Sequence, residues 1–367
     1  MDKFKRWVGI GLAVALIAAV GALFWPRQGD EAEAVTPLII LPGHSPNLRS
    51  LAFFSDGKTL LSAGADNAIR FWDVETGKLL NTGSVPGSSA SISPDEQRIA
   101  VFHSPNEVYL WNISTGESTM FKTDHGFVEI KFSPNNRTVS TATPGGVSTS
   151  IWDVETGALL HTVDGFAFKY SPDGKRILTV VIGSTPKVWD VDTGALLHTL
   201  GGHRGWSYGS YSPDGKRIVT ASYENAIQVW DAEKGNLVHT LGGHHSRTLM
   251  PAYYPDGKTI SSVGERNVKI WDADTGALIK TLNEKMAAGH RHLSENPHSP
   301  TGKYIIQKIP KAVRIWDAAS GELLYTLSHS SRNVHRLAYS PDGKTIAGAD
   351  ENGEIYIWRI EQTTPAP

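Results

Sequence analysis

The sequence predicts an all-β protein built from eight copies of one four-stranded antiparallel unit. The first observation is a series of eight tryptophans that are spaced 39, 41, 37, 41, 41, 45 and 42 residues apart. The second is that aspartate directly follows six of them. A fixed period near forty residues is typical of one supersecondary unit that is repeated and stacked on itself. The eight residues are Trp72, Trp111, Trp152, Trp189, Trp230, Trp271, Trp316 and Trp358.

Within each copy, turn residues separate short apolar runs, and the fifth copy shows this most clearly. Ser-Pro-Asp-Gly-Lys at 212–216 precedes a strand-like segment at 217–222, and a turn at 224–225 leads into 226–231. Proline presets φ and glycine accepts positive φ, so both residues favour turns. The segments between the turns alternate with a period of two, which is typical of strands. No helical periodicity is present from residue 37 onward.

These motifs resemble the WD40-repeat β-propeller family over about residues 37–362. The resemblance implies a ring of four-stranded blades around a central channel. Eight complete copies predict eight blades, and seven blades are the alternative because the second copy is degenerate. The Gly-rich repeats and the short leader suggest a bacterial-type, membrane-anchored member. The matching motifs are Gly-His at 43–44, 202–203 and 243–244, Ser-Pro-Asp-Gly at 171–174, 212–215 and 340–343, and Thr-Gly at 76–77, 156–157, 193–194 and 275–276.

The two ends of the repeat region predict how the ring closes. The last copy ends at 358–360 without an outermost strand, whereas Leu38–Leu41 precedes the first Gly-His pair, where such a strand belongs. We expect the N-terminal segment to complete the last blade and to cover its open edge. Pro186 lies three residues before Trp189 and lacks a ladder donor, so it predicts a bulge or a frayed third strand in the fourth blade.

In the family that the chain resembles, the histidine of Gly-His joins a hydrogen-bonded network with a strand Ser or Thr, a turn Asp and the tryptophan. The fifth copy matches this pattern best, with Glu in place of Asp, and the first copy has glycine at the hydroxyl position. The resemblance therefore predicts an incomplete network and a ring that is stabilised mainly by apolar packing. The matched residues are His203, Ser222, Glu224 and Trp230 in the fifth copy, and His44, Gly64, Asp66 and Trp72 in the first.

The N-terminus predicts a membrane anchor at residues 1–25. Lys3, Lys5 and Arg6 precede the uncharged stretch 7–25, which ends at Pro26. As a helix this stretch spans about 28 Å, close to the ~30 Å hydrocarbon core, and its basic flank is expected to stay in the cytoplasm. We predict a single-pass membrane protein whose propeller, after a linker at 26–36, is periplasmic or at the cell surface. The alternative is a secreted protein released by signal cleavage near Ala34. Residues 363–367 form a short tail.

Composition and motifs argue against several functions. A formal net charge of −2 is unlike the basic footprint of nucleic-acid-binding proteins. The chain has no cysteine, and it contains neither a Gly-x-Ser-x-Gly elbow nor a phosphate loop. The innermost strands offer few acids, Glu129 among them. We therefore predict no enzymatic activity, no cofactor, no small-molecule substrate and no bound metal. The alternative metal site is His290 with His292 and either Glu295 or His298, in a segment that we interpret as an insertion or as partner surface.

The predicted function is a non-catalytic scaffold that binds a partner protein through the loops on one rim of the ring. The eight tryptophans are expected to pack between blades. One alternative is an envelope assembly factor that binds peptides or nascent envelope proteins. The other is a propeller enzyme or small-ligand sensor that uses the central channel. Arg, Trp and Tyr are the usual anchors of protein interfaces, and the rim residues chosen are Arg204, Trp206, Tyr223, His245, Arg247, Arg266, Arg291, Arg332 and Asn333.

Overall fold

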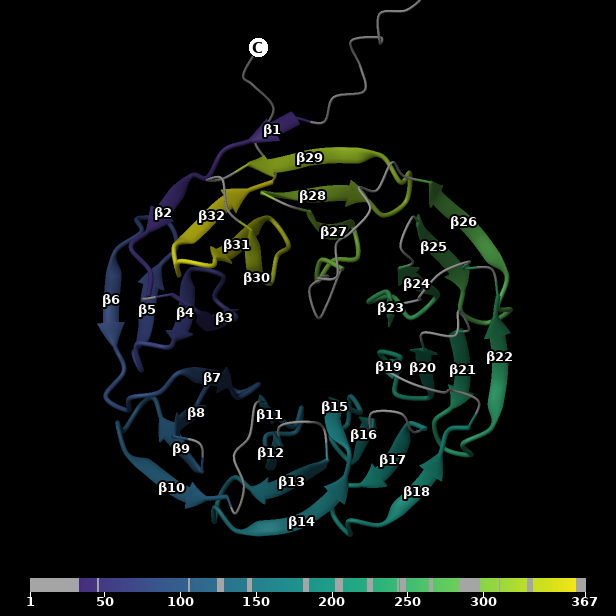
Figure 1. The fold of residues 1–367 in the computed structure, drawn as a ribbon, viewed down its shortest axis with the longest axis horizontal. Coiled ribbons are helices and arrows are strands. Elements are labelled where there is room, and N and C mark those ends of the chain that lie inside the picture. Colours follow the sequence, from purple (N-terminus) through teal and green to yellow (C-terminus); the bar gives the residue numbers. More distant parts are fainter. Residues whose placement is uncertain are drawn as a thin grey trace, which may run out of the picture. The chain divides into compact units, whose positions relative to one another are not determined.

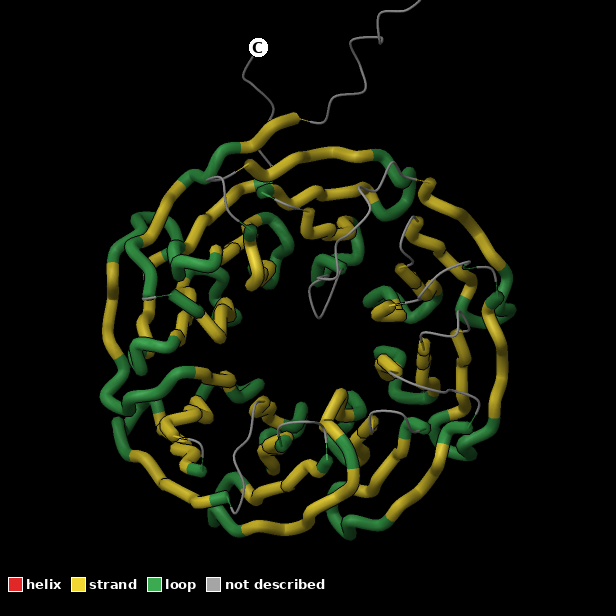
Figure 2. The backbone as a smooth tube through the Cα atoms, in the orientation of Figure 1, coloured by secondary structure: helices red, strands yellow, loops and turns green. Residues whose placement is uncertain are grey.

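The fold is a closed ring of eight four-stranded antiparallel sheets, or blades, around a central channel (Figure 1). The computed structural model describes residues 33–360 apart from 45, 105, 124–128, 144–146, 181–184, 202–206, 223–226, 243, 245–248, 264–266, 284–297, 310 and 329–332. Strands and short connections make up the described residues (Figure 2). The all-β fold and the eight blades that the sequence predicts are confirmed, and seven blades are excluded.

Six blades consist of consecutive strands, and we number them in chain order. Blade 1 is β3 Leu48–Phe53, β4 Thr59–Gly64, β5 Ile69–Asp73 and β6 Leu79–Thr82. Blade 2 is β7 Ser89–Ile92, β8 Arg98–Ser104, β9 Glu107–Asn112 and β10 Ser118–Lys122. Blade 3 is β11 Glu129–Phe132, β12 Thr138–Ala142, β13 Ser148–Asp153 and β14 Leu159–Asp164. Blade 4 is β15 Phe166–Tyr170, β16 Arg176–Val180, β17 Lys187–Asp190 and β18 Leu196–Thr199. Blade 5 is β19 Ser207–Tyr211, β20 Arg217–Ser222, β21 Ile227–Asp231 and β22 Leu237–Leu241. Blade 6 is β23 Leu249–Tyr253, β24 Thr259–Val263, β25 Asn267–Asp272 and β26 Leu278–Asn283.

The last two blades each include a strand from the N-terminal end of the propeller. Blade 7 is β27 Tyr304–Ile309, β28 Ala312–Asp317 and β29 Leu323–Ser328, with β1 Glu33–Val35 beside β29. Blade 8 is β30 Val334–Tyr339, β31 Thr345–Asp350 and β32 Ile355–Arg359, with β2 Ile39–Leu41 beside β32. Ile39 pairs with Ile357 and Leu41 with Ile355, so the predicted closure of the last blade by the N-terminal segment is confirmed.

β1 is an additional outer strand that the sequence interpretation did not include. Tyr304 pairs with Asp317 in blade 7 as Thr59 pairs with Asp73 in blade 1. β27 is therefore a second strand, and the described residue His298 forms an isolated antiparallel bridge with its Ile305. β1 accordingly adds an edge strand beyond the usual outermost one, inside the stretch expected to be linker.

The turns follow from the Ser-Pro-Asp-Gly motif, as the fifth blade illustrates. The Ser212 hydroxyl donates to Asp214 at 2.6 Å and accepts the backbone N–H of Arg217 at 2.9 Å. Gly215 has φ of 72°, a conformation that glycine adopts without a Cβ penalty. The motif therefore fixes the reversal between the first and second strands of the blade.

The core lies between neighbouring blades. The Phe121 ring of blade 2 stacks on Trp152 of blade 3 with centroids 4.5 Å apart, and Phe71 of blade 1 meets Trp111 of blade 2 edge-on at 5.8 Å. Trp316 is half-buried, and the other seven repeat tryptophans are buried. Burial of large aromatic side chains at these contacts holds each blade against the next.

The third strand of blade 4, β17, begins at Lys187, directly after Pro186, and has four residues. Pro186 therefore shortens this strand. The backbone carbonyl of Pro186 still accepts the N–H of Leu200 at 2.8 Å. A register shift occurs between Val188 and Trp189, but the same shift precedes the tryptophan in blades 1, 3, 5, 6 and 7. The bulge is therefore a property of the repeat rather than of the proline.

The predicted anchor at 1–25 and the tail at 363–367 lie outside the described residues. Across the part of the chain that is described, no helix is long and apolar enough to cross a membrane.

Candidate binding surfaces: blade contacts, central channel and loop rim

The hydrogen-bond network of blade 1 is complete, which corrects the interpretation from sequence. The ring nitrogens of His44 lie 2.7 Å from the Asp66 carboxylate and 2.7 Å from the Ser62 hydroxyl, and Trp72 Nε1 donates to that same hydroxyl at 2.8 Å. The hydroxyl position is therefore Ser62 and not residue 64. Gly64 instead leaves room for His44, because a Cβ there would lie 2.8 Å from the His44 Cβ.

The same correction applies to the other blades. Trp230 Nε1 donates to the Thr220 hydroxyl at 2.8 Å, two residues before the serine that the resemblance suggested. The Ser222 side chain, His203 and Glu224 lie outside the described part of the chain. In blade 6, His244 and Trp271 both bond the Ser262 hydroxyl, at 2.7 and 2.8 Å. In blades 3 and 4 the indoles donate to Thr141 at 3.0 Å and Thr179 at 2.7 Å. Hydrogen bonds between buried polar side chains therefore stabilise more blades than the resemblance predicted.

Histidines on the outermost strands link adjacent blades by hydrogen bonds at the perimeter of the ring. Nε2 of His161, His198 and His239 donates to the backbone carbonyl of Asp192, Glu233 and Asp274 respectively, at 2.7–2.8 Å. Each acceptor lies in the turn after the tryptophan of the following blade. The three side chains also occupy the space in which a Cβ at Gly194, Gly235 or Gly276 would lie. These histidines are thus structural.

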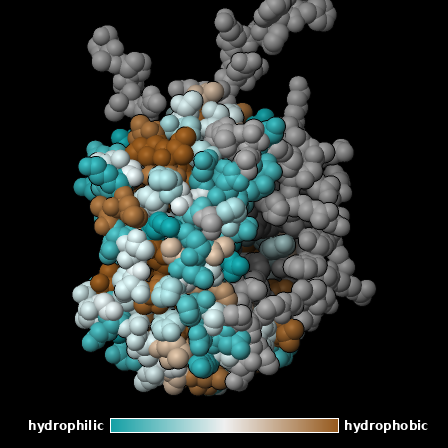
Figure 3. All heavy atoms as spheres, turned by 60° about the vertical axis from the view of Figure 1, so that its left-hand side comes forward, coloured by the Kyte–Doolittle hydropathy of each residue, from teal (hydrophilic) through white to brown (hydrophobic). Residues whose placement is uncertain are grey.

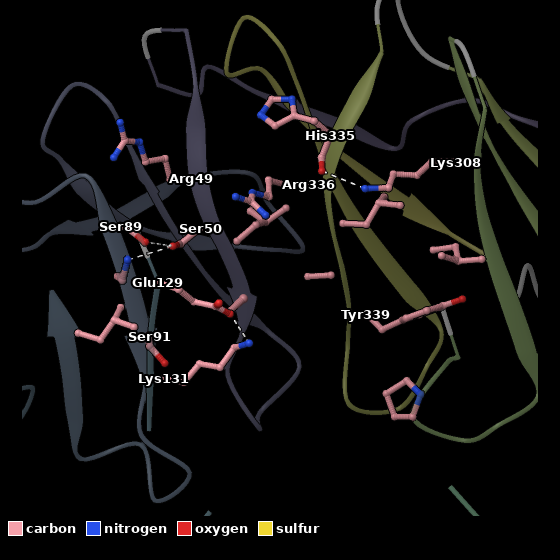
Figure 4. A pocket seen from close by; sticks show the side chains of 18 of the residues that line it. Arg49, Ser50, Ser89, Ser91, Glu129, Lys131, Lys308, His335, Arg336 and Tyr339 are labelled. Atoms are coloured by element: carbon pink, nitrogen blue, oxygen red, sulfur yellow. Dashed lines mark hydrogen bonds and ion pairs between the residues drawn. The ribbon is translucent and has the colours of Figure 1, made fainter. Parts of the chain in front are cut away.

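The central channel contains a cavity of about 600 Å³ that is lined mainly by innermost strands. Its walls come from blades 1, 2, 3, 7 and 8, and small side chains such as Ala52, Ser91 and Ala338 leave it open. The Ser50 and Ser89 hydroxyls lie 3.0 Å apart and join blades 1 and 2 at the wall. Figure 4 shows how the charged side chains stand around this space.

The charge of the described channel lining is predominantly positive. Arg49, Lys131, Lys308 and Arg336 line the cavity, and Glu129 is the one carboxylate among the described lining residues. The Glu129 carboxylate forms an ion pair with the Lys131 ammonium group (Figure 4). Glu129, an acid that the sequence analysis named on an innermost strand, is therefore engaged by Lys131, and the described lining carries more cations than carboxylates.

His335 connects blade 8 to blade 1 at the channel wall. Its Nε2 donates to the backbone carbonyl of Leu48 at 3.1 Å, and its own carbonyl accepts a bond from Lys308 Nζ at 3.1 Å. Burial lowers the pKa of His335, and the positive charges of Arg336 and Lys308 lower it further. The imidazole is accordingly neutral at pH 7.

The candidate metal ligands His290, His292 and Glu295 lie outside the described residues. His298 is described and is buried against the Tyr254 ring, with ring centroids 4.0 Å apart. Its Nε2 lies 2.6 Å from the Ser261 hydroxyl, and burial lowers its pKa to about 4. Within the described ranges, no cluster of three or more His, Asp or Glu side chains is arranged to hold a metal ion.

Of the nine rim residues chosen from the sequence, only Asn333 lies in the described part of the chain. It is exposed, its side-chain oxygen accepts the Lys311 N–H at 3.3 Å, and its amide donates to Glu351 at 3.3 Å. As partner contacts all nine stay predictions, and those outside the described residues are Arg204, Trp206, Tyr223, His245, Arg247, Arg266, Arg291 and Arg332.

The perimeter carries exposed apolar side chains on the outermost strands. Leu38 and Ile40 at β2 and Leu79 and Leu80 on β6 are all about half exposed. Figure 3 shows apolar groups on the side of the ring that these strands form, separated by polar ones. Singly scattered apolar side chains of this kind are ordinary on protein surfaces.

Comparison with protein families identifies four of the repeats. Residues 35–73, 194–231, 235–272 and 321–359 match the family described as "WD40: WD domain, G-beta repeat". Protein tipD of Dictyostelium discoideum is 31% identical over 130 residues, which cover 34% of this chain and 21% of that protein. The LST8 homolog of Drosophila melanogaster is 24% identical over 168 residues, covering 41% and 53%. Eukaryotic translation initiation factor 3 subunit I of Emericella nidulans is 29% identical over 109 residues, covering 29% and 32%.

The matched regions thus span between about a fifth and about half of the length of these relatives. All three are eukaryotic, so they give no support to the bacterial, membrane-anchored character expected from the sequence.

Two solved structures share the fold. The crystal structure of the C-terminal WD40 domain of Sif2 superposes with a TM-score of 0.74 at 15% identity, covering 90% of this chain and all of that one. The computationally designed Ika8 protein gives a TM-score of 0.71 at 22% identity, with 90% and 100% coverage.

Proposed function

Because the chain is a WD40-repeat β-propeller protein, we propose that it acts as a non-catalytic scaffold that binds partner proteins through the loops on one rim of the ring. The observation that carries the proposal is the closed eight-bladed ring, whose blades are fastened to each other by buried aromatics and by interblade hydrogen bonds. Binding residues are commonly carried on loops that such a rigid scaffold positions. One relative is also, by its name, a subunit of a larger factor.

The antiparallel order of each blade divides the loops between two rims. The Ser-Pro-Asp-Gly turn and the turn after the tryptophan lie at one end of the strands. We therefore expect segments 202–206 and 223–226, which lie outside the described residues, at the opposite end. These segments contain Arg204, Trp206 and Tyr223, residue types that anchor protein interfaces. We propose this opposite rim as the partner surface. The other residues proposed for it are His245, Arg247, Arg266, Arg291, Arg332 and Asn333.

The test is crosslinking and affinity capture with the full-length protein from its native cells. A variant with Arg204→Ala, Trp206→Ala and Tyr223→Ala is expected to lose the captured partner. The matched control is Lys175→Ala, Lys216→Ala and Lys234→Ala, which alters three exposed residues on the other rim. Thermal melting first checks that both variants are folded. If both then capture the partner equally well, this rim is excluded as the binding surface.

We further propose that residues 7–25 anchor the propeller in a membrane, with Lys3, Lys5 and Arg6 in the cytoplasm and the propeller outside it. Cleavage after Ala34, the alternative, would cut inside β1 and leave Val35 as the first residue. The buried position of Val35 in the core of blades 7 and 8 supports an uncleaved leader.

Peptide mapping of the protein from its native cells tests this placement. We expect the N-terminal residues to be retained, the protein to resist extraction by alkaline carbonate, and the propeller to be open to protease added outside the cytoplasm. Recovery in a soluble fraction would refute the anchor, and a chain that begins at Val35 would establish the secreted alternative.

A further inference from the structure

Four neighbouring blades each present a polar side chain at the same level of the channel wall. In each blade this residue lies on the innermost strand, three positions before the residue that is in register with the repeat tryptophan. All four line the cavity of about 600 Å³. We call this set the polar arc, and its members, in ring order from blade 8 through blades 1, 2 and 3, are Arg336, Ser50, Ser89 and Glu129.

The middle of the polar arc offers hydroxyl groups. The Ser50 hydroxyl oxygen accepts the backbone N–H of Ala90 at 3.0 Å and lies 3.0 Å from the Ser89 hydroxyl oxygen. Each hydroxyl carries one proton, and one hydrogen bond joins the two groups. Whichever serine donates that bond, the proton of the other is available to a further acceptor. Both side chains are half-buried in the wall, so a ligand in the cavity can reach them.

The two ends of the polar arc carry opposite charges, and only one of them is paired within the arc's surroundings. The Glu129 carboxylate forms an ion pair with the Lys131 ammonium group. Arg336 is exposed and forms no hydrogen bond or ion pair with another described residue. Figure 4 shows its side chain reaching from β30 toward the strand that carries Ser50. A guanidinium in this state can form two parallel hydrogen bonds to a carboxylate or a phosphate.

The polar arc matches a ligand that has one anionic group and several hydroxyl groups. Inorganic phosphate would engage the guanidinium and leave the serine hydroxyls unused, whereas a neutral sugar would leave the guanidinium without a partner. Small side chains, Ala52, Ser91 and Ala338, keep space open beside the polar arc. The cavity of about 600 Å³ also lies within the range of about 300–1,000 Å³ that is typical of small-molecule sites.

We propose that the central channel binds a small acidic carbohydrate, a sugar with a carboxylate or a phosphate group. The anionic group binds the Arg336 guanidinium, and sugar hydroxyls bond the Ser50 and Ser89 hydroxyls. Carboxylate and phosphate share the paired bonding that a guanidinium offers, so the two kinds of acidic sugar are separated by experiment. This site goes beyond the scaffold proposal and does not depend on it, because it uses the innermost strands and not the loops of the rim.

The test is saturation-transfer NMR of the full-length protein, titrated with glucuronate, glucose 6-phosphate and glucose. We expect at least one acidic sugar to bind about tenfold more tightly than glucose, because only the acidic sugars form charge-assisted hydrogen bonds. The tighter of the two identifies the preferred anionic group. Arg336→Gln is expected to weaken binding of that sugar by about tenfold and to leave the affinity for glucose unchanged.

Variants and simple anions provide the controls. Arg359→Gln, at an exposed arginine on β32 outside the channel lining, should leave every affinity unchanged. Ser89→Ala should weaken binding of the acidic sugar by about threefold, the usual effect of losing a neutral hydrogen bond. Acetate and methyl phosphate carry the anionic groups without the sugar hydroxyls and should bind more weakly than the acidic sugars. Thermal melting checks that each variant is folded.

Three results would overturn the proposal. The first is that neither acidic sugar binds. The second is that acetate or methyl phosphate binds as tightly as the acidic sugars, which would reduce the site to a simple anion site. The third is that Arg336→Gln and Arg359→Gln lose the same affinity, which would make the attraction a general effect of charge.

Discussion

The Nε2 atom of His44 lies 2.7 Å from the hydroxyl oxygen of Ser62, which also accepts the indole N–H of Trp72 at 2.8 Å. His44 and Ser62 are both buried, and His44 lies directly before the first blade, so this contact ties the entry of the chain to the ring. The backbone N–H of His44 also donates to the carbonyl of Gly353 in blade 8. One hydroxyl thus supports both a histidine and a tryptophan at the site where the ring closes.

Ser62→Ala is therefore expected to destabilise the protein by about 1–3 kcal/mol, because it leaves two buried polar atoms without a partner. The midpoint of urea unfolding, followed by tryptophan fluorescence, measures this change. Ser89→Ala, at a half-buried serine in the channel wall, is the control and should cost less. An equal effect of the two substitutions would mean that the hydrogen bonds of Ser62 to His44 and Trp72 add no more to the free energy of unfolding than the Ser89 hydroxyl does.

Blade 2 offers the reverse experiment. Trp111 Nε1 is buried without a hydrogen-bond partner in the described structure. Val101 occupies in blade 2 the position that Ser62 occupies in blade 1, because each pairs with the residue two before the tryptophan, Tyr109 and Arg70 respectively. Val101→Thr places a hydroxyl at the position that serves Trp72 and Trp230, and we expect it to stabilise the protein by about 1 kcal/mol. Val101→Ala, which removes methyl groups and adds no acceptor, should destabilise. A Val101→Thr protein no more stable than Val101→Ala would contradict the equivalence of these positions.

These contacts also show which features the sequence could predict. The period of the tryptophans and the turn motifs determine the number of blades, because each copy buries its faces only against its neighbours. The closure of blade 8 was predictable since Leu38–Leu41 is an apolar segment placed where a strand was missing. The hydroxyl position was misassigned by two residues, because counting from the turns does not determine which strand residue faces the indole.

Other features carry no local pattern. The three residues of β1 are too few to show alternation, so its place beside β29 depends on tertiary contacts such as the burial of Val35. The channel cations come from β3, β11, β27 and β30, which are far apart in the sequence, so their proximity appears only once the ring is closed. All nine rim residues remain predictions, and eight of them lie outside the described part of the chain.

The outer-strand histidines predict a measurable coupling between blades. His198 donates to Glu233 O at 2.8 Å, and a Cβ on Gly235 would lie 2.6 Å from the His198 Nδ1. His198→Ala should cost about 1 kcal/mol, and Gly235→Ala about 1–2 kcal/mol or more because its φ is positive. The double variant is expected to cost less than the sum of the single ones, since the clash is absent without the imidazole. Additive losses in a urea-unfolding cycle would refute this contact.

Closure of blade 8 by β2 can be tested within one strand. Leu41 is fully buried, whereas its neighbour Ile40 is 58% exposed. Leu41→Ala is expected to destabilise the protein by about 2–5 kcal/mol through cavity formation, and Ile40→Ala by less than about 0.5 kcal/mol. Thermal melting of the two variants gives the comparison. Similar small shifts would mean that the ring does not depend on β2 for its closure.

Stability should fall as the pH is lowered below about 6.5, because burial lowers the pKa of His298 to about 4 from an ordinary value of 6.5. Between these values the unfolded chain binds a proton that the folded chain does not, so acid favours unfolding, with full stability above pH 6.5 and a loss of about 3 kcal/mol by pH 4. Burial lowers the pKa of His44 and His335 in the same direction, which steepens the decline. Urea midpoints between pH 4.5 and 7.5 measure the slope, and His298→Gln, which keeps a polar group for Ser261, should flatten it. A slope that His298→Gln leaves unchanged would show that this histidine is not buried in its neutral form.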